Sequence, residues 1–180
     1  MKRLDLGCGT RKRPGYIGVD RLAVPGVDVV HDLTVRPYPF DDGEIDEVVM
    51  DNVLEHLADP VGTMEEIHRI CRAGATVTVV VPYFRSCYAF IDPTHRNFFG
   101  VDWFAYFDPS HPFCSRYGYS RARFAVERRE FDREYRQLRI GPLHRLCIRF
   151  AQKHPHFYEE RLSHLYPLHS LTFRLRVIKR

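Results

Sequence analysis

A short glycine-rich segment, LDLGCGT, follows the first apolar residues of the chain. It places an acid, Asp5, two residues before Gly7, and a second glycine, Gly9, two residues further on. Glycines at this spacing permit a tight turn and a close approach of the backbone to a ligand. The next apolar run ends in Asp20 and Arg21, and the Asp20 carboxylate could accept hydrogen bonds from both hydroxyls of a ribose. This layout is typical of a nucleotide-binding site.

The residues of the turn discriminate between two kinds of nucleotide ligand. A dinucleotide-binding turn has a third glycine and opens a helix that meets a pyrophosphate, but Lys12 stands at the third position. The Asp5 carboxylate would repel a pyrophosphate and attract an ammonium group. S-adenosylmethionine has an ammonium, a carboxylate and no phosphate. Asp5 could hold its ammonium, and backbone N–H groups of Gly7, Cys8 and Gly9 could hold its carboxylate.

Further polar residues follow the third and fourth apolar runs. Asp32 could accept from an adenine amino group, while the Leu33 N–H donates to a ring nitrogen. The fourth run ends in Asp51, Asn52 and Val53, where the methyl group of the same ligand would leave. Because parallel strands end at one edge of a sheet, we expect these residues to lie together with the glycine turn.

Two groups of residues could act on a methyl acceptor. Methyl transfer depends mainly on orientation, and a base is needed only where the acceptor loses a proton. His56 follows the fourth run and is a candidate base; the alternative is that it braces a helix. In DPTHRNFF, Asp92 could orient His95 and Arg96 could clamp an anionic acceptor. The alternative for this segment is an Asp-Pro turn that fixes a loop.

The motifs occur in the order and spacing of the class I S-adenosylmethionine-dependent methyltransferases of type 11, which the sequence resembles over residues 3–84. LDLGCGT resembles the first motif, Asp20 the second, HDL the third and DNVLEHL the fourth. The resemblance implies a Rossmann-like α/β fold with a mostly parallel seven-stranded sheet, order 3-2-1-4-5-7-6, whose last strand is antiparallel. It also implies S-adenosylmethionine as donor and S-adenosylhomocysteine as product.

The apolar pattern supplies elements that could position these residues. Five runs are interpreted as strands, at 3–7, 15–20, 26–32, 45–52 and 75–84. A helix is expected after Asp59, with Pro60 in its first position, an apolar stripe that extends to Cys71, and Gly74 as its C-cap. The early helices are expected to be abbreviated, with at most one turn at 10–13. The helix that usually precedes the first strand in this family has no expected counterpart.

The chain is expected to form one domain over residues 1–180, with the aromatic-rich segment 85–120 as a lid or a substrate-binding insertion. Residues 121–131 and 169–180 alternate like strands, and 143–165 could form one or two helices interrupted at Pro155. The five cysteines and ten histidines show no CxxC, HxH or HExxH spacing, so no metal site is predicted. With no membrane span and no signal peptide apparent, a cytoplasmic protein with reduced thiols is expected.

Three functions remain open at this point. The first is methyl transfer to an O or N atom of a small, polar or anionic acceptor, for which a lid with aromatic and polar groups is suited. The second is modification of RNA or protein, because residues 116–149 contain ten arginines and only four acids. The third is binding of the ligand without catalysis.

Overall fold

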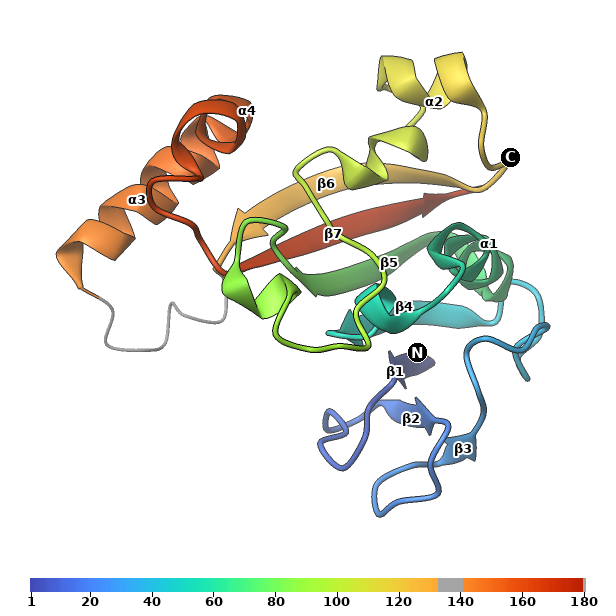
Figure 1. The fold of residues 1–180 in the computed structure, drawn as a ribbon. Coiled ribbons are helices and arrows are strands. Elements are labelled where there is room, and N and C mark those ends of the chain that lie inside the picture. The colour runs from blue at the N-terminus through green and yellow to red at the C-terminus, as the bar shows by residue number, and fades with distance from the viewer. Residues whose placement is uncertain (133–140, 180) are drawn as a thin grey trace.

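The computed structural model describes residues 1–132 and 141–179. Seven strands form one sheet in the order β3-β2-β1-β4-β5-β7-β6 (Figure 1). The strands are β1 (Arg3–Leu6), β2 (Ile17–Asp20), β3 (Val29–Val30), β4 (Ile45–Asp51), β5 (Cys71–Pro82), β6 (Arg123–Phe131) and β7 (Ser170–Ile178). The pairs from β3 to β5 are parallel, and β7 is antiparallel to both of its neighbours. The predicted sheet order and the antiparallel last strand are confirmed.

The helices are distributed unevenly along the chain. They are α1 (Pro60–Ile70), α2 (Pro112–Tyr117), α3 (Pro142–Lys153) and α4 (Pro155–Phe157), with short 3₁₀ turns η1 (Leu54–His56), η2 (Cys87–Ala89) and η3 (Trp103–Tyr106) and a π-helical turn η5 (Tyr158–Leu162). No helix occurs within residues 1–51, all of which the structure describes. The abbreviated early helices are therefore confirmed. In Figure 1, α3 and α4 stand beside the end of the sheet where β6 ends and β7 begins.

Strand β5 lies in the middle of the buried core. It pairs with β4 on one side and with β7 on the other, and its alternate residues Val77, Val79 and Val81 are fully buried. Side chains β-branched at these positions suit a strand covered on both faces. One apolar cluster extends from Leu4 in β1 to Val177 in β7, so the N-terminal parallel strands and the C-terminal strands share a core.

Two local predictions need correction. Helix α1 starts as expected, since the Asp59 side chain accepts from the Gly62 N–H at 2.9 Å, but it ends at Ile70. Cys71 is already extended and begins β5, so it does not belong to the helix. Gly74, expected as the C-cap, lies inside β5 with φ +77°, close to the shift in register between β4 and β5. A left-handed glycine serves a strand bulge as well as a helix end.

The third strand is also shorter than predicted. Instead of 26–32, only Val29 and Val30 pair with β2, and Val30 is 60% exposed at the edge of the sheet. An edge strand has one hydrogen-bonding partner, so its apolar run extends beyond the residues that are paired.

The aromatic-rich segment 85–120 divides into two parts. Phe99 and Phe104 are fully buried, and the Phe104 ring packs against Phe173 of β7 at 4.7 Å between centroids. This part belongs to the core. Residues 92–97 instead lie beside η1, where they approach the candidate site described below. A covering role for the segment stays a prediction.

Asp108 fastens the aromatic segment to β6. Its carboxylate accepts from the Val126 N–H at 2.8 Å and from the N–H and hydroxyl of Ser110 at 2.9 and 2.7 Å. Burial acts to raise the pKa of this carboxyl, but these hydrogen bonds outweigh it and hold the pKa below the ordinary value of 3.8.

Replacement of Asp108 by asparagine is expected to lower the free energy of unfolding by about 1–2 kcal/mol near neutral pH, because one charged acceptor is lost. A depressed folded pKa means that the stabilisation is present above the unfolded pKa and disappears as the pH falls through the folded pKa. Urea unfolding at about pH 7 and at about pH 3 should therefore show a difference between wild type and variant that shrinks in acid. A pH-independent difference would contradict this assignment.

Candidate functional site

A cavity of about 580 Å³ opens where the parallel strands β1 to β4 end. Its wall consists of Gly7, Asp20, Arg21, His31, Asp32, Leu33, Thr34, Asn52, Val53, His56, Leu57, Pro93, Thr94 and Arg96. The carboxyl edge of the strands is the position at which open α/β sheets bind ligands, and the volume is typical of a small-molecule site.

The structure brings most of the predicted cofactor residues to this cavity. Those in the wall are Gly7, Asp20, Arg21, Asp32, Leu33, Asn52 and Val53. Asp5, Cys8, Gly9 and Asp51 are not part of the wall. Of the predicted catalytic residues His56 lines the cavity, whereas Asp92 and His95 lie on either side of two residues that do, Pro93 and Thr94.

The glycine turn needs both of its glycines for different reasons. Gly7 has φ +72° and donates its N–H to the Val19 carbonyl at 2.7 Å, and a Cβ at this position would meet the Val53 side chain at 2.4 Å. Gly9 has φ +50° but open space around it. Gly7 therefore allows a close approach between the turn and the residues after β4, and Gly9 supplies only the left-handed backbone.

Replacement of Gly7 by alanine is expected to destabilise the fold by about 1–2 kcal/mol through the left-handed backbone alone, with a further cost from the contact with Val53. The double variant with Val53→Ala should recover the steric part and leave the backbone part. Thermal unfolding of both variants checks this. Equal stability of the single and double variants would show that the close approach is unimportant.

Asp5 holds the residues that follow the glycine turn. It is 4% exposed, and its carboxylate accepts from the Arg13 N–H at 2.8 Å. Burial raises the pKa of this carboxyl. The Arg13 guanidinium also pairs with Asp51 at 2.5 Å, which connects the turn to the end of β4. The predicted contact of Asp5 with an ammonium group stays a prediction, since the observed role is to hold the loop.

Cys8 faces the interior of the turn. Its thiol is buried, and burial raises its pKa, so it is a neutral packing group near neutral pH. The sequence analysis missed its neighbour Gly18 in β2. A Cβ at Gly18 would meet the Cys8 sulfur at 2.7 Å and the Gly26 carbonyl oxygen at 2.8 Å. The signal available in the sequence was a glycine inside an apolar strand, which often marks a close backbone approach.

Asp20 is placed where a ribose acceptor would stand. One carboxylate oxygen accepts from the Gly9 N–H at 2.9 Å, and the other accepts from the Leu22 N–H at 3.0 Å. Asp20 also lines the cavity. These hydrogen bonds orient the carboxylate, and each oxygen keeps a further lone pair for a ligand. Asp28 resembles it chemically, because it accepts from the Gly18 N–H at 2.7 Å, but it lies outside the cavity wall.

The segment after β3 forms another wall of the cavity. Asp32 accepts from both the N–H and the hydroxyl of Thr34, at 2.8 and 2.7 Å, and these bonds lower its pKa. His31 and Thr34 line the cavity too and were not predicted. The signal for Thr34 was its position two residues after an aspartate, where a side chain–backbone turn commonly forms.

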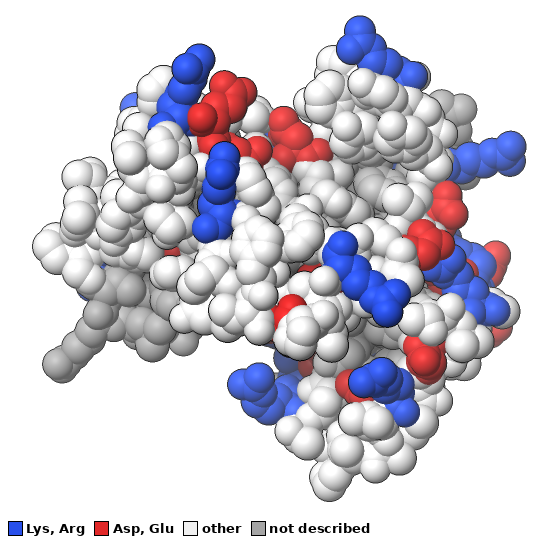
Figure 2. Space-filling model, in the orientation of Figure 1, with Lys and Arg blue, Asp and Glu red and all other residues white. Residues whose placement is uncertain are grey.

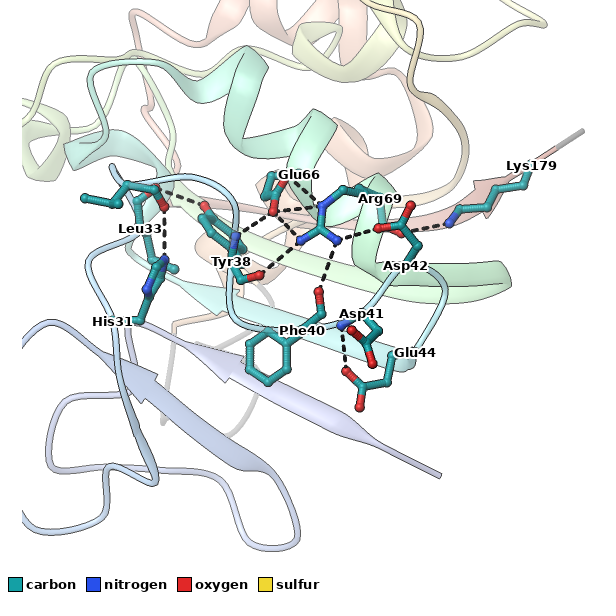
Figure 3. A network of polar contacts seen from close by, with 11 residues as sticks. His31, Leu33, Tyr38, Phe40, Asp41, Asp42, Glu44, Glu66, Arg69 and Lys179 are labelled. Atoms are coloured by element: carbon teal, nitrogen blue, oxygen red, sulfur yellow. Dashed lines mark hydrogen bonds and ion pairs between the residues drawn. The ribbon is translucent and has the colours of Figure 1, made fainter.

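A polar network holds this wall against α1 (Figure 3). The Tyr38 hydroxyl donates to the Leu33 carbonyl at 3.0 Å, and the Tyr38 N–H donates to Glu66 at 2.6 Å. Arg69 donates to Glu66 and to the carbonyls of Tyr38 and Phe40, with N–O distances of 2.5 to 3.1 Å. The position of Leu33 therefore depends on an ion pair in α1.

The loop at residues 92–97 forms a further wall of the cavity and is hydrogen-bonded to η1 and the residue after it. The N–H of Arg96 donates to the Glu55 carbonyl at 2.8 Å, and the Asn97 side chain donates to the Leu57 carbonyl at 2.7 Å. These bonds place residues 92–97 beside the turn that follows β4. The rings of His56 and His95, which are far apart in sequence, consequently pack with 4.7 Å between their centroids.

A hydrogen-bonded chain sets the tautomer of His56. The Thr94 hydroxyl lies 2.7 Å from an oxygen of Asp92, whose pKa is lowered chiefly by its hydrogen bonds from Thr94, so the hydroxyl proton goes to that carboxylate. The Thr94 oxygen must then accept from His56 Nδ1 at 2.8 Å. Burial, with His95 beside it, lowers the pKa of His56 and favours the neutral ring. His56 Nε2 thus keeps a free lone pair, and Asp92 acts on His56 through Thr94 instead of on His95.

Glu55 lies close to His56 and His95. Its side chain is 1% exposed, and burial raises its pKa to about 8. One ligand-type atom from each of Glu55, His56 and His95 lies within 4.8 Å of the others. Sequence reasoning did not assign Glu55 a role, because its burial follows from the loop at 92–97.

The comparisons with known proteins agree with this geometry. The family model for a methyltransferase domain, Methyltransf_11, matches residues 4–79, which contain β1 to β4, α1 and most of β5. This segment of the chain, a little under half of its length, is therefore similar to a methyltransferase domain. No curated protein matches the sequence.

Solved structures share the fold of this chain at low sequence identity. A chain of the complex between the Haloferax volcanii Trm112 methyltransferase activator and a methyltransferase has 16% identity and a TM-score of 0.58, with 99% of this chain and 83% of that chain covered. A SAM-dependent methyltransferase from Archaeoglobus fulgidus has 18% identity and a TM-score of 0.53, with 97% and 86% covered. The [4+2]-cyclase SpnF has 15% identity and a TM-score of 0.59, with 99% and 75% covered.

Some arginines of the second half of the chain pair with acids among the described residues. Arg174 and Arg176 both lie against Glu127, and Arg129 pairs with Asp102 at 2.7 Å. On the face shown in Figure 2, Lys and Arg side chains are scattered, some beside acids and some with no acid next to them. Residues 133–140 of the arginine-rich segment lie outside the described residues. Across 1–132 and 141–179, no helix has the length and hydropathy of a transmembrane span.

Proposed function

We propose that the chain transfers a methyl group from S-adenosylmethionine to an O or N atom of a small, polar or anionic acceptor. The observation that supports this most directly is one cavity that joins the Gly7 turn, the Asp20 carboxylate and the His56 ring. The first two suit the donor, and the third suits the acceptor.

Each part of the donor has residues in the cavity wall that suit it. Asp20, oriented by two backbone N–H groups, would accept from the ribose hydroxyls. Asp32 and the Leu33 backbone would meet the adenine at the wall supported by Tyr38. Gly7 lines the cavity, and its turn would meet the methionine end of the donor. Asn52 and Val53 follow β4 and would flank the sulfur.

S-adenosylmethionine, when bound, supplies a methyl carbon that an acceptor lone pair attacks, so that the carbon–sulfur bond breaks and its electron pair remains on the sulfur of S-adenosylhomocysteine. The acceptor must lose a proton if it is a hydroxyl or an ammonium. His56 Nε2 has the free lone pair to take it, because Nδ1 is held by Thr94 and Asp92. His95 packs on the His56 ring and restricts its rotation.

The acceptor class follows from the rest of the wall. Arg96 and Arg21 line the cavity together with the hydroxyl of Thr94. A guanidinium binds a carboxylate or phosphate with two parallel hydrogen bonds. These groups favour an acceptor with a negative charge near the reacting atom. An RNA acceptor is the second candidate: among the described arginines of residues 116–149, ion pairs with acids are formed by Arg128 and Arg129.

Calorimetric titration tests the donor, with S-adenosylhomocysteine and NAD as competing ligands. Saturable binding of S-adenosylhomocysteine and none of NAD is expected. Formation of S-adenosylhomocysteine from S-adenosylmethionine, followed with pools of small acidic metabolites and with total RNA, tests the reaction. His56→Ala should lose turnover and keep its affinity for S-adenosylhomocysteine.

Three results would overturn the proposal or part of it. Binding of NAD alone would remove the donor assignment. Binding of S-adenosylhomocysteine with turnover on RNA only would replace the acceptor class. Binding without turnover on either pool would indicate a non-catalytic protein that retained the fold.

A further inference from the structure

We propose that Glu55, His56 and His95 form a binding site for a first-row divalent transition-metal ion of the Zn²⁺ type. One nitrogen from each imidazole and one carboxylate oxygen lie within 4.8 Å of one another. Two histidines and a carboxylate are a known ligand set for zinc and for non-haem iron, with further positions left open. The sequence spacing predicted no metal site, because its ligands come from two segments that only the fold brings together.

The hydrogen bonds behind the two histidines point their ligand atoms in the required way. The Ala89 carbonyl lies 3.0 Å from His95 Nδ1 and can only accept, so Nδ1 carries the proton. His56 Nδ1 likewise donates to Thr94, which donates in turn to Asp92. Both rings therefore keep Nε2 free. Metal-binding histidines almost always have such a partner on the other ring nitrogen.

Glu55 supplies an independent observation. Its side chain is 1% exposed, and neither carboxylate oxygen has a hydrogen-bond partner among the described residues. Buried polar groups are nearly always paired, so a buried carboxylate with two unpaired oxygens requires an explanation. A cation held jointly with the adjacent histidines would pair it.

The site would have to contract to bind an ion. Ligand atoms about 2.0–2.2 Å from a zinc ion stand roughly 3–3.5 Å apart in a tetrahedral arrangement, whereas the three ligand atoms here lie within 4.8 Å of one another. The backbone is already fixed, because Arg96 and Asn97 donate to the Glu55 carbonyl at 2.8 and 3.2 Å.

Imidazole ligands select among cations. Mg²⁺ and Ca²⁺ prefer oxygen ligands, whereas Zn²⁺, Co²⁺ and related ions accept two nitrogens and one oxygen. Because His56 lines the cavity, an open position of the ion would face it. With the ion bound, the His56 Nε2 lone pair would be occupied and would not take the acceptor proton. The ion would instead bind an acceptor oxygen and ease loss of its proton, a use that rests on the proposed function. The acceptor class would then be one with a metal-binding hydroxyl or carboxylate.

A second group, Asp132, His144 and His169, serves as an internal comparison. His144 Nε2 pairs with Asp132 at 3.0 Å, and the other oxygen of Asp132 accepts from the N–H groups of His169 and Ser170. Asp132 Oδ2 has no partner with hydrogen-bond geometry, but the contact with His144 gives it an ion-pair partner. Neither oxygen of Glu55 has a hydrogen-bond or ion-pair contact of this kind among the described residues, which distinguishes the first group.

The test measures metal binding by the full-length protein without any donor or acceptor. Calorimetry with Zn²⁺ and absorption spectroscopy with Co²⁺ should show one site, and Mg²⁺ should not compete. Glu55→Gln and His95→Ala are expected to weaken Zn²⁺ binding by at least about 100-fold, and Thr94→Val by about 10-fold, because it removes only the partner of a ligand. Circular dichroism identifies any variant that fails to fold.

Matched controls make the result decisive. His144→Ala removes a histidine of the other group, and His164→Ala removes an exposed histidine outside both groups. Both should bind Zn²⁺ like the wild type. No binding by the wild type, or binding that survives His95→Ala and is lost in His144→Ala, would overturn the proposal. Since no methyl transfer is measured, failure of the proposed function would leave this result intact, and the reverse also holds.

Discussion

Replacement of Asp20 by alanine is expected to weaken the binding of S-adenosylhomocysteine by at least roughly 100-fold. The carboxylate would accept two hydrogen bonds from the ribose, and hydrogen bonds to a charged group contribute about 1.5–3 kcal/mol each. The variant would also release the Gly9 N–H that Asp20 orients. Calorimetric titration of the folded variant measures the loss.

Asp28→Ala is the matched control for this experiment. Asp28 also accepts from a backbone N–H of the same region, that of Gly18, but it is not part of the cavity wall. If Asp20 binds the ligand directly, the control should retain most of its affinity. Equal losses in the two variants would show that both carboxylates act only by holding the loops. Unchanged affinity in Asp20→Ala would remove the ribose contact altogether.

Replacement of Arg69 by alanine is expected to lower the free energy of unfolding by about 2–3 kcal/mol. Burial acts to raise the pKa of Glu66, but the Arg69 guanidinium and the Tyr38 N–H outweigh it and hold the pKa below its ordinary value. Removal of Arg69 would leave Glu66 charged, 8% exposed and poorly paired. Loss of one partner from a fully buried pair costs about 3–5 kcal/mol, and the partial exposure of Arg69 reduces this.

A double-mutant cycle separates the ion pair from simple loss of packing. Glu66→Gln in the Arg69→Ala background removes the stranded charge, so the double variant should be more stable than the sum of the single effects. Urea unfolding of the four proteins provides the values. Additive effects would mean that the pair contributes little. The Arg69 variant should also bind S-adenosylhomocysteine more weakly, since Leu33 is held through Tyr38.

The sheet could be predicted from the sequence because its signals are local. Apolar runs identified the strands, and the pair Asp59 and Pro60 identified the start of α1. The order of the strands came from the family resemblance. The prediction that Gly74 caps a helix was wrong. A left-handed glycine is compatible with a helix end and with a bulge, and only the pairing of β5 with β4 decides between them.

The positions of the candidate site residues were more predictable on the donor side, although His56 and Arg96 were also expected and line the cavity. Asp20 is the last residue of β2 and Asp32 comes two residues after β3, where the parallel arrangement fixes their location. Asp5 lies inside β1, and its carboxylate accepts from the Arg13 N–H, because the loop folds back over it. Glu55 and His95 are brought together by hydrogen bonds between segments about forty residues apart. No local pattern encodes such a contact.

Because the stretch from β1 to β4 contains no helix, we expect the stability of this end of the molecule to depend strongly on a bound ligand. Carboxylates that bind backbone N–H groups, those of Asp5, Asp20 and Asp28, replace the covering helices there. Little apolar surface is buried by such loops, so this end should open before the half built on β5 and β7. A donor seated across Gly7, Asp20 and Leu33 would act as a missing structural element. The amount of donor available would then govern how much of the protein is competent to receive an acceptor.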